Sequence, residues 1–155
     1  MTNEAYKHAQ TSKSRKGLYA TRIFDAQESG MKCSVTNDVD SRGPMQSGEH
    51  IFAHCAGEFY RLNHLFAPNR GLKTKGDGSY EVVARQRIEA GPNLMFDFAM
   101  HYYDLGKETH RRCGADGCRG AILGWIDLPA ESKSEYWDLA ATYLFALDSK
   151  CRGHD

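Results

Sequence analysis

Two short polar stretches contain side chains that could bind a small polar ligand. The first is "RLNHLFAPN" (residues 61–69), and the second, "NLMFDF" (93–98), follows about one strand and one turn later. The amide of Asn63 has both a donor and an acceptor, which suits it to hold a zwitterionic group. The alternative is that Asn63 and Asn69 are turn residues and that His64 is a core histidine with satisfied hydrogen bonds. The two stretches therefore indicate either a ligand site or a pair of turns.

The residues around these stretches predict short strands that would position them. Residues 17–24 and 80–88 are rich in β-branched and aromatic residues, and Asp77-Gly78 predicts a hairpin turn. "EHIFAHC" and "EFYRLNHLF" predict two more short strands around Gly57. Residues 28–48 are polar and contain scattered Asn, Asp, Ser, Gly and Pro, which predicts a loop with short strand fragments.

The C-terminal part of the sequence predicts one amphipathic helix from about residue 130 to 148. Pro129 stands where a helix starts, and apolar residues recur at helical spacing at Tyr136, Leu139, Ala140, Tyr143, Leu144 and Leu147. Strands followed by a helix predict an α+β domain that is mostly β.

Composition sets limits on the function. The chain has 155 residues, enough for one domain with a core, and its 20 Lys and Arg balance 20 Asp and Glu. Zero net charge argues against a protein whose main task is to grip nucleic-acid phosphates, although residues 1–15 predict a basic, solvated arm. No window is long and apolar enough for a transmembrane helix, and the polar N-terminus lacks a signal peptide, so we expect an intracellular protein without a membrane partner. Five cysteines without a dense framework indicate reduced thiols.

Four segments occur in an order that resembles one known family. They are "KGLYATRIFDAQE", "RLNHLFAPN", "RQRIEAGPNLMFDF" and "RRCGADGCRGAILG". Together they resemble the SET-domain family, whose members are mostly S-adenosylmethionine-dependent lysine methyltransferases, from about Lys16 to Gly124 and only weakly through residues 28–58. The resemblance implies a SET-like fold of short β-sheets with a knot-like C-terminal crossing, which is a rare arrangement. It also implies four parts: an N-terminal arm (1–15), a SET-like domain (16–105), a post-SET-like segment (106–125), and a C-terminal helix and tail (126–155).

The resemblance implies S-adenosylmethionine as the cofactor. By similarity, Asn63 would orient its amino-acid part, and the backbone at His64 would meet its adenine. Gly17 matches the second glycine of the family's strand opening, where backbone amides approach the cofactor closely, and Arg15 replaces the first. The implied cofactor-binding set is Lys16, Gly17, Leu18, Arg61, Asn63, His64 and Ile122.

The expected substrate channel departs from the family at its catalytic residue. The resemblance implies a channel lined by Phe96, Phe98 and Leu123, but the family carries a catalytic Tyr where this chain has Phe98. Loss of one polar transition-state contact typically costs about 10²–10³ in rate. Tyr102 and Tyr103 are the candidates for a substitute phenol, so Phe98, Tyr102 and Tyr103 form the catalytic set. The alternative reading makes Phe96 and Phe98 core aromatics, and it is compatible with the channel.

The post-SET-like segment retains only part of the family's zinc motif. By similarity, zinc would be bound by a Cys-x-Cys-x4-Cys run and a cysteine near the Asn-His pair. Cys113 and Cys118 keep the x4 spacing, but Arg111 and Phe66 stand at the other two ligand positions. Two thiolates do not close a tetrahedral zinc site. Although His110 and Cys151 could complete one, we predict a loop without metal.

Three functions are compatible with the sequence. The first is a SET-type methyltransferase acting on lysine or another amine, impaired to the extent that Phe98 lacks a hydroxyl. The second is an enzyme that uses the SET scaffold on a small molecule, such as a biosynthetic cyclase, and the third is a binding module without catalysis. The expected partners are a protein lysine or a small-molecule substrate, with no nucleic acid. Because the region between Gly17 and Asn63 is short, histone specificity does not follow from the resemblance.

Overall fold

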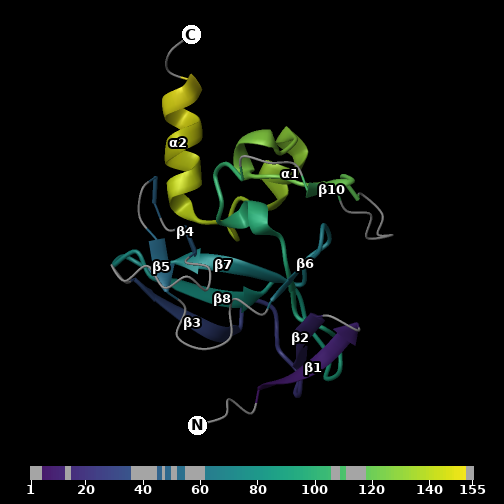
Figure 1. Cartoon of the computed structure of the whole chain (residues 1–155). Helices are drawn as coiled ribbons and strands as arrows, with labels where there is room; N and C mark the ends of the chain where they lie inside the picture. Colours follow the sequence, from purple (N-terminus) through teal and green to yellow (C-terminus); the bar gives the residue numbers. More distant parts are fainter. Residues whose placement is uncertain are drawn as a thin grey trace.

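A five-stranded antiparallel sheet forms the body of the protein. The computed structural model describes residues 5–12, 15–35, 45–46, 48–49, 52–54, 62–105, 109–110 and 118–152. The sheet order is β4-β5-β3-β8-β7 (Figure 1). Its strands are β3 (Ser29–Val35), β4 (Met45–Gln46), β5 (Phe52–His54), β7 (Arg70–Thr74) and β8 (Tyr80–Ala84). The hairpin predicted at Asp77-Gly78 is confirmed as the turn between β7 and β8, and Gly78 adopts the positive φ of 82° that such a turn needs.

Two N-terminal predictions are corrected by the structure. Residues 6–12, expected in a solvated arm, form β1 (Tyr6–Ser12), which pairs antiparallel with β2 (Arg15–Ala20). β2 therefore begins and ends earlier than the predicted strand over 17–24. The strand fragments predicted within the loop over 28–48 include β4 and the seven-residue β3, which is longer than a fragment. In β3, Met31 and Cys33 are buried and Lys32 is exposed. That alternation is typical of a strand, but the surrounding Ser, Gly and Lys residues conceal it.

A short parallel pair joins the two polar stretches. β6 (Asn63–His64) lies beside β9 (Met95–Phe96), with Asn63 opposite Met95 and His64 opposite Phe96. A 3-10 helix, η2 (Phe98–Met100), follows β9 directly. In the described part of "EFYRLNHLF" the predicted strand is thus only two residues long. Its pairing with β9 brings the two polar stretches together.

The C-terminal segment that was expected to form one helix forms two. η3 (Trp125–Asp127) precedes α1 (Ala130–Glu135), and α2 (Thr142–Arg152) follows a turn. In that turn the carbonyl of Leu139 accepts from the amide of Leu72 in β7 at 2.9 Å, and the amide of Ala141 donates to the carbonyl of Met100 at 2.8 Å. These backbone groups hydrogen-bond to the body of the protein instead of continuing a helix. The apolar positions that suggested one helix are still mostly buried, since Tyr136, Leu139, Ala140, Leu144 and Leu147 all face the protein.

Two glycines allow the C-terminal segment to approach the rest of the chain closely. A Cβ at Gly71 would lie 2.7 Å from the Cβ of Leu139, and a Cβ at Gly124 would lie 2.5 Å from the carbonyl oxygen of Tyr103. Both distances are below contact, so neither position accepts a side chain without movement of the backbone. The remaining short pair, β10 (Thr109–His110) and β11 (Ala121–Ile122), is antiparallel. No helix within the described residues is long and apolar enough to cross a membrane.

Candidate functional site

The β6–β9 pair places the two polar stretches side by side, as the sequence suggested. Beyond the pair itself, the amide of Leu65 donates to the carbonyl of Phe96 at 3.1 Å. The amide of Phe98 donates to Nδ1 of His64 at 3.3 Å. Residues more than 30 positions apart therefore form one hydrogen-bonded backbone frame.

The two asparagines of the first stretch have different roles. Asn69 is structural, because its Nδ2 donates to the carbonyl of Asn93 at 2.8 Å and its Oδ1 accepts from the amide of Met95 at 2.8 Å. Asn63 is half-buried, and no hydrogen bond joins its side chain to any residue that the structure describes. The alternative reading thus fits Asn69, while the donor and acceptor of Asn63 are available to a ligand.

His64 is a buried, neutral ring with one donor that is not satisfied. Since Nδ1 accepts from Phe98, the proton of the neutral ring belongs on Nε2, and Nε2 is buried without a partner among the described residues. Burial lowers the pKa of His64, and nearby Arg119 lowers it further, against the opposing effect of Asp97. The ring lies 4.7 Å from that of Phe66 and 5.1 Å from that of Phe98, measured between centroids.

The predicted cofactor residues on β2 approach the same frame from its other side. The carbonyl of Leu18 accepts from the amide of Leu94 at 2.7 Å, and Leu94 directly precedes the residue that faces Asn63. Gly17 and Leu18 are buried, whereas Lys16 is exposed. Ile122 is buried in β11. Arg61, also predicted to bind the cofactor, lies outside the described residues.

The predicted channel and catalytic residues have unequal exposure. Phe96 is fully buried in the core, while Phe98 and Leu123 are half-buried. The rings of Phe98 and His101 lie 6.1 Å apart edge to face, and the Tyr102 ring is tilted against that of His101 with 4.0 Å between centroids. The backbone amide of Tyr103 donates to Oε1 of Gln46 at 3.2 Å. Both Phe98 and Tyr102 therefore contact the ring of His101.

Sequence reasoning missed a buried carboxylate at the centre of the site. Oδ1 of Asp97 accepts from the amide of Ala99 at 3.0 Å and thereby caps η2. Oδ2 accepts from the hydroxyl of Tyr136 at 2.9 Å and from Nη2 of Arg119 at 2.8 Å. Asp97 is fully buried, and burial together with this carboxylate raises the pKa of Tyr136. An acid between two phenylalanines, Phe96 and Phe98, was the available signal, because such a group needs partners.

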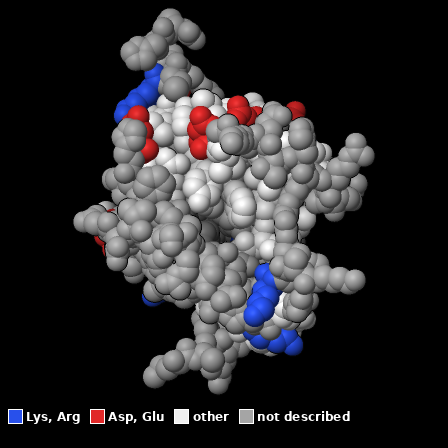
Figure 2. All heavy atoms as spheres, viewed as in Figure 1, with Lys and Arg blue, Asp and Glu red and all other residues white. Residues whose placement is uncertain are grey.

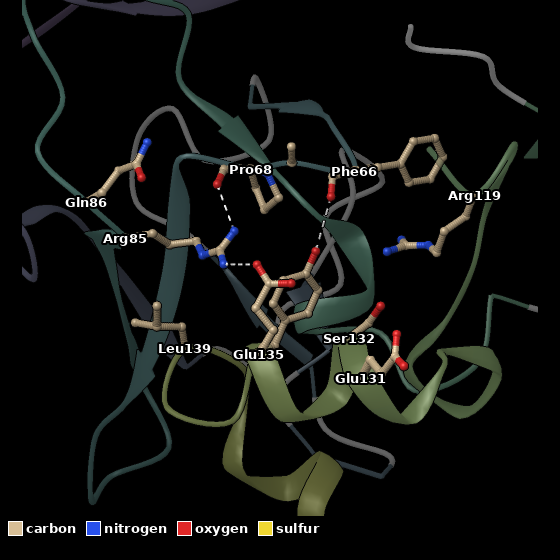
Figure 3. A pocket seen from close by; sticks show the side chains of 11 residues that line it. Phe66, Pro68, Arg85, Gln86, Arg119, Glu131, Ser132, Glu135 and Leu139 are labelled. Atoms are coloured by element: carbon tan, nitrogen blue, oxygen red, sulfur yellow. Dashed lines mark hydrogen bonds and ion pairs between the residues drawn. The ribbon is translucent and has the colours of Figure 1, made fainter. Parts of the chain in front are cut away.

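A separate cavity of about 520 Å³ lies between residues 66–68, the end of β8 and α1 (Figure 3). Arg85 and Arg119 extend into it from opposite walls. Arg85 pairs with Glu135 at 2.6 Å and donates to the carbonyl of Pro68 at 3.0 Å. None of the residues predicted to form the cofactor site or the channel lines this cavity.

His101 gives the site a predicted dependence on pH. Burial lowers the pKa of this histidine to about 3. Above its ordinary pKa of about 6.5 the ring is neutral whether the chain is folded or not, so pH has no effect through it. Between about 6.5 and 3 only the unfolded chain binds the proton, and stability falls with acidification by up to about 1.4 kcal/mol per pH unit.

Urea unfolding of the wild type and of His101→Gln at pH 7, 6, 5 and 4.5 measures this effect. When the free energy of unfolding is plotted against pH, we expect the wild type to be steeper than His101→Gln by up to about 1.4 kcal/mol per pH unit. The variant should keep the part of the slope that is due to His64, whose pKa is also lowered. Equal slopes for the two proteins would contradict the prediction.

Comparisons with known proteins support the fold. No family model matches the chain, and no curated protein sequence matches it. Among solved structures, KRYPTONITE in complex with mCHH DNA, H3(1–15) peptide and SAH aligns with 76% of this chain at a TM-score of 0.59 and 18% identity. KRYPTONITE in complex with mCHG DNA and SAH aligns at 0.59 and 16% identity. A Plasmodium falciparum protein described as a candidate histone methyltransferase aligns with 60% of this chain and 96% of its own, at 0.48 and 11% identity. The fold is SET-like.

The likeness covers only part of the larger protein. This chain spans 29% of the KRYPTONITE chain in both complexes. Both of those complexes contain DNA. The expectation that this chain binds no nucleic acid stays a prediction drawn from its zero net charge. In the view of Figure 2 the described Lys and Arg side chains lie in separate groups, one of them over the β1–β2 hairpin, while Asp and Glu gather at the helical end.

Proposed function

We propose that this protein is an S-adenosylmethionine-dependent methyltransferase of the SET type that acts on lysine or another amine. The observation that carries the proposal is the side-chain amide of Asn63 in β6, which hydrogen-bonds to none of the described residues. The SET-like fold supports it, since KRYPTONITE aligns with this chain in structures that contain SAH, the product left when S-adenosylmethionine gives up its methyl group.

The residues present fit this cofactor. The side chain of Asn63 has the donor and acceptor that a zwitterionic amino-acid group requires, and the orphaned Nε2 donor of His64 lies one residue away. Lys16, Gly17 and Leu18 would contribute backbone groups from β2, while Arg61 and Ile122 would complete the set. When bound, the cofactor supplies an electrophilic methyl group.

The role of the channel residues is to keep the accepting amine neutral and aligned. Apolar walls at Phe98 and Leu123 disfavour the ammonium form, because burial lowers the pKa of an amine. Phe96, predicted for the same channel, is fully buried in the core and would not touch the substrate. Alignment in a near-attack geometry then supplies most of the remaining effect. Phe98 offers a wall but no hydrogen bond, so the rate is expected to be low unless Tyr102 contributes its hydroxyl.

Asn63→Ala tests cofactor binding directly. We expect the wild type to bind SAH, and we expect the variant to bind it about 10–100-fold more weakly, because a hydrogen bond to a charged group is worth about 1.5–3 kcal/mol. Isothermal titration calorimetry measures both affinities. The melting temperature should not change, since no described residue depends on the Asn63 side chain.

Gln86→Ala is the matched control for this experiment. It removes an exposed amide that lines the other cavity, so SAH affinity should be unchanged. No binding of SAH or S-adenosylmethionine to the wild type at millimolar concentration would reject the methyltransferase proposal. An enzyme acting on a small molecule through the SET scaffold, or a binding module, would then remain.

A further inference from the structure

Arg119 connects the post-SET-like segment to both polar stretches. Its Nη2 lies 2.8 Å from Oδ2 of Asp97, and its guanidinium lies 4.7 Å from the centroid of the Phe66 ring. Only 10% of the Arg119 side chain is exposed, and the Asp97 side chain is fully buried. One cation therefore contacts a residue of the first stretch and a residue of the second.

The positions of these partners make the contact important for the site. Phe66 is two residues beyond His64 and packs edge-on against its ring, while Asp97 directly precedes Phe98. On the other side, Gly120 has a positive φ of 73° and turns the chain from Arg119 into β11, which carries Ile122. Fixing Arg119 thus fixes the start of β11 relative to His64 and Phe98.

The zinc that the family resemblance implies does not fit these residues. Phe66 occupies the ligand position near the Asn-His pair and has no atom that binds zinc. The guanidinium of Arg119 already stacks on that ring, so a divalent cation there would face a positive charge in a buried environment. Cys113 and the side chains of His110 and Cys151 lie outside the described part of the chain.

We propose that Arg119 is a positioning residue that anchors residues 118–122 over the cofactor site through Asp97 and Phe66, in place of a metal. This inference rests on the proposed function, because the anchored segment carries Ile122 of the cofactor-binding set. A buried ion pair with a planar, stacked guanidinium favours one arrangement over others more than it adds net stability. Arg119 therefore acts on cofactor affinity by fixing the position of the segment.

Arg119→Ala tests the inference with two readouts. We expect the variant to bind SAH at least tenfold more weakly, and we expect hydrogen–deuterium exchange of peptides covering residues 118–122 to accelerate in the protein without cofactor. Arg119→Lys keeps the charge but not the planar face, so it should show intermediate effects on both readouts. If the alanine variant does not fold, Arg119→Lys tests the proposal in its place.

Arg85→Ala is the matched control. Arg85 lines the opposite wall of the same cavity, has a comparably buried side chain and also forms an ion pair, but it contacts Glu135 and the Tyr136 ring rather than residues 118–122. A general loss of stability would affect both variants, whereas loss of positioning affects only Arg119. Equal SAH affinity and equal exchange in wild type and both Arg119 variants would overturn the proposal.

Zinc removal supplies an independent check. Incubation of the purified protein with a chelator should leave SAH affinity unchanged, and loss of binding that added Zn²⁺ restores would overturn the proposal. SAH binding tests the proposed function, and hydrogen–deuterium exchange tests the role of Arg119. If the wild type binds no SAH, the proposed function fails, while exchange at residues 118–122 still reports whether Arg119 anchors the segment.

Discussion

Asp97→Ala is expected to lower the free energy of unfolding by about 3–5 kcal/mol, because removing one partner leaves a buried charge uncompensated. The lost carboxylate accepts from the amide of Ala99, the hydroxyl of Tyr136 and the guanidinium of Arg119. All of these contacts are made by a side chain with no exposed surface. Urea or thermal unfolding followed by circular dichroism measures the change.

Two further variants separate the charge from the hydrogen bonds. Asp97→Asn keeps an acceptor for Ala99 but presents an amide group to donors, so it should be destabilised to an intermediate extent. Asp25→Ala removes an exposed carboxylate that pairs with Arg87 at 3.0 Å and should barely move the unfolding midpoint. If Asp97→Ala unfolds at the same urea concentration as Asp25→Ala, Asp97 does not organise the site.

Phe98→Tyr is expected to raise the rate of methyl transfer by about 10²-fold, because it restores a polar contact at the transition state. The ring of Phe98 lies in a half-buried position 5.1 Å from the His64 ring, where a hydroxyl would adjoin the predicted channel. Single-turnover transfer of a radiolabelled methyl group to a library of lysine peptides and small amines measures the gain.

Phe96→Tyr is the control for this gain. Phe96 is fully buried, so its hydroxyl would enter the core, lower stability and leave methyl transfer no faster. If the Phe98→Tyr protein binds SAH but neither it nor the wild type methylates any acceptor, the site performs other chemistry. A small-molecule reaction in the aromatic chamber then becomes the leading function.

The features that the sequence predicts well depend on nearby residues. Asp77 accepts from the amide and the hydroxyl of Ser79, and Gly78 supplies the positive φ, so the whole turn is specified within three residues. Likewise, the order of four motifs indicated the SET-like fold. Local turn chemistry and motif order are properties that one chain displays without its three-dimensional structure.

The features that sequence reasoning missed depend on distant partners. Nothing local to Asp97 indicates that Arg119 and Tyr136, 22 and 39 residues further on, will satisfy its carboxylate. The break between α1 and α2 is similar. At that turn the amide of Leu72 donates to Leu139 and the carbonyl of Met100 accepts from Ala141, and no helix-breaking residue stands there. Apolar periodicity reports which residues are buried, but it does not report what they are buried against.

The position of residues 136–141 along β7 has a consequence for the order in which the protein folds during synthesis. β7 is an edge of the five-stranded sheet, and the segment that covers it and supplies Tyr136 emerges from the ribosome more than 60 residues later. Until then, the nascent chain carries an open strand edge and an unsatisfied acid, features that favour association with other chains. Residues 136–141 are therefore translated after the rest of the site, and they cover part of an edge that would otherwise be available for aggregation.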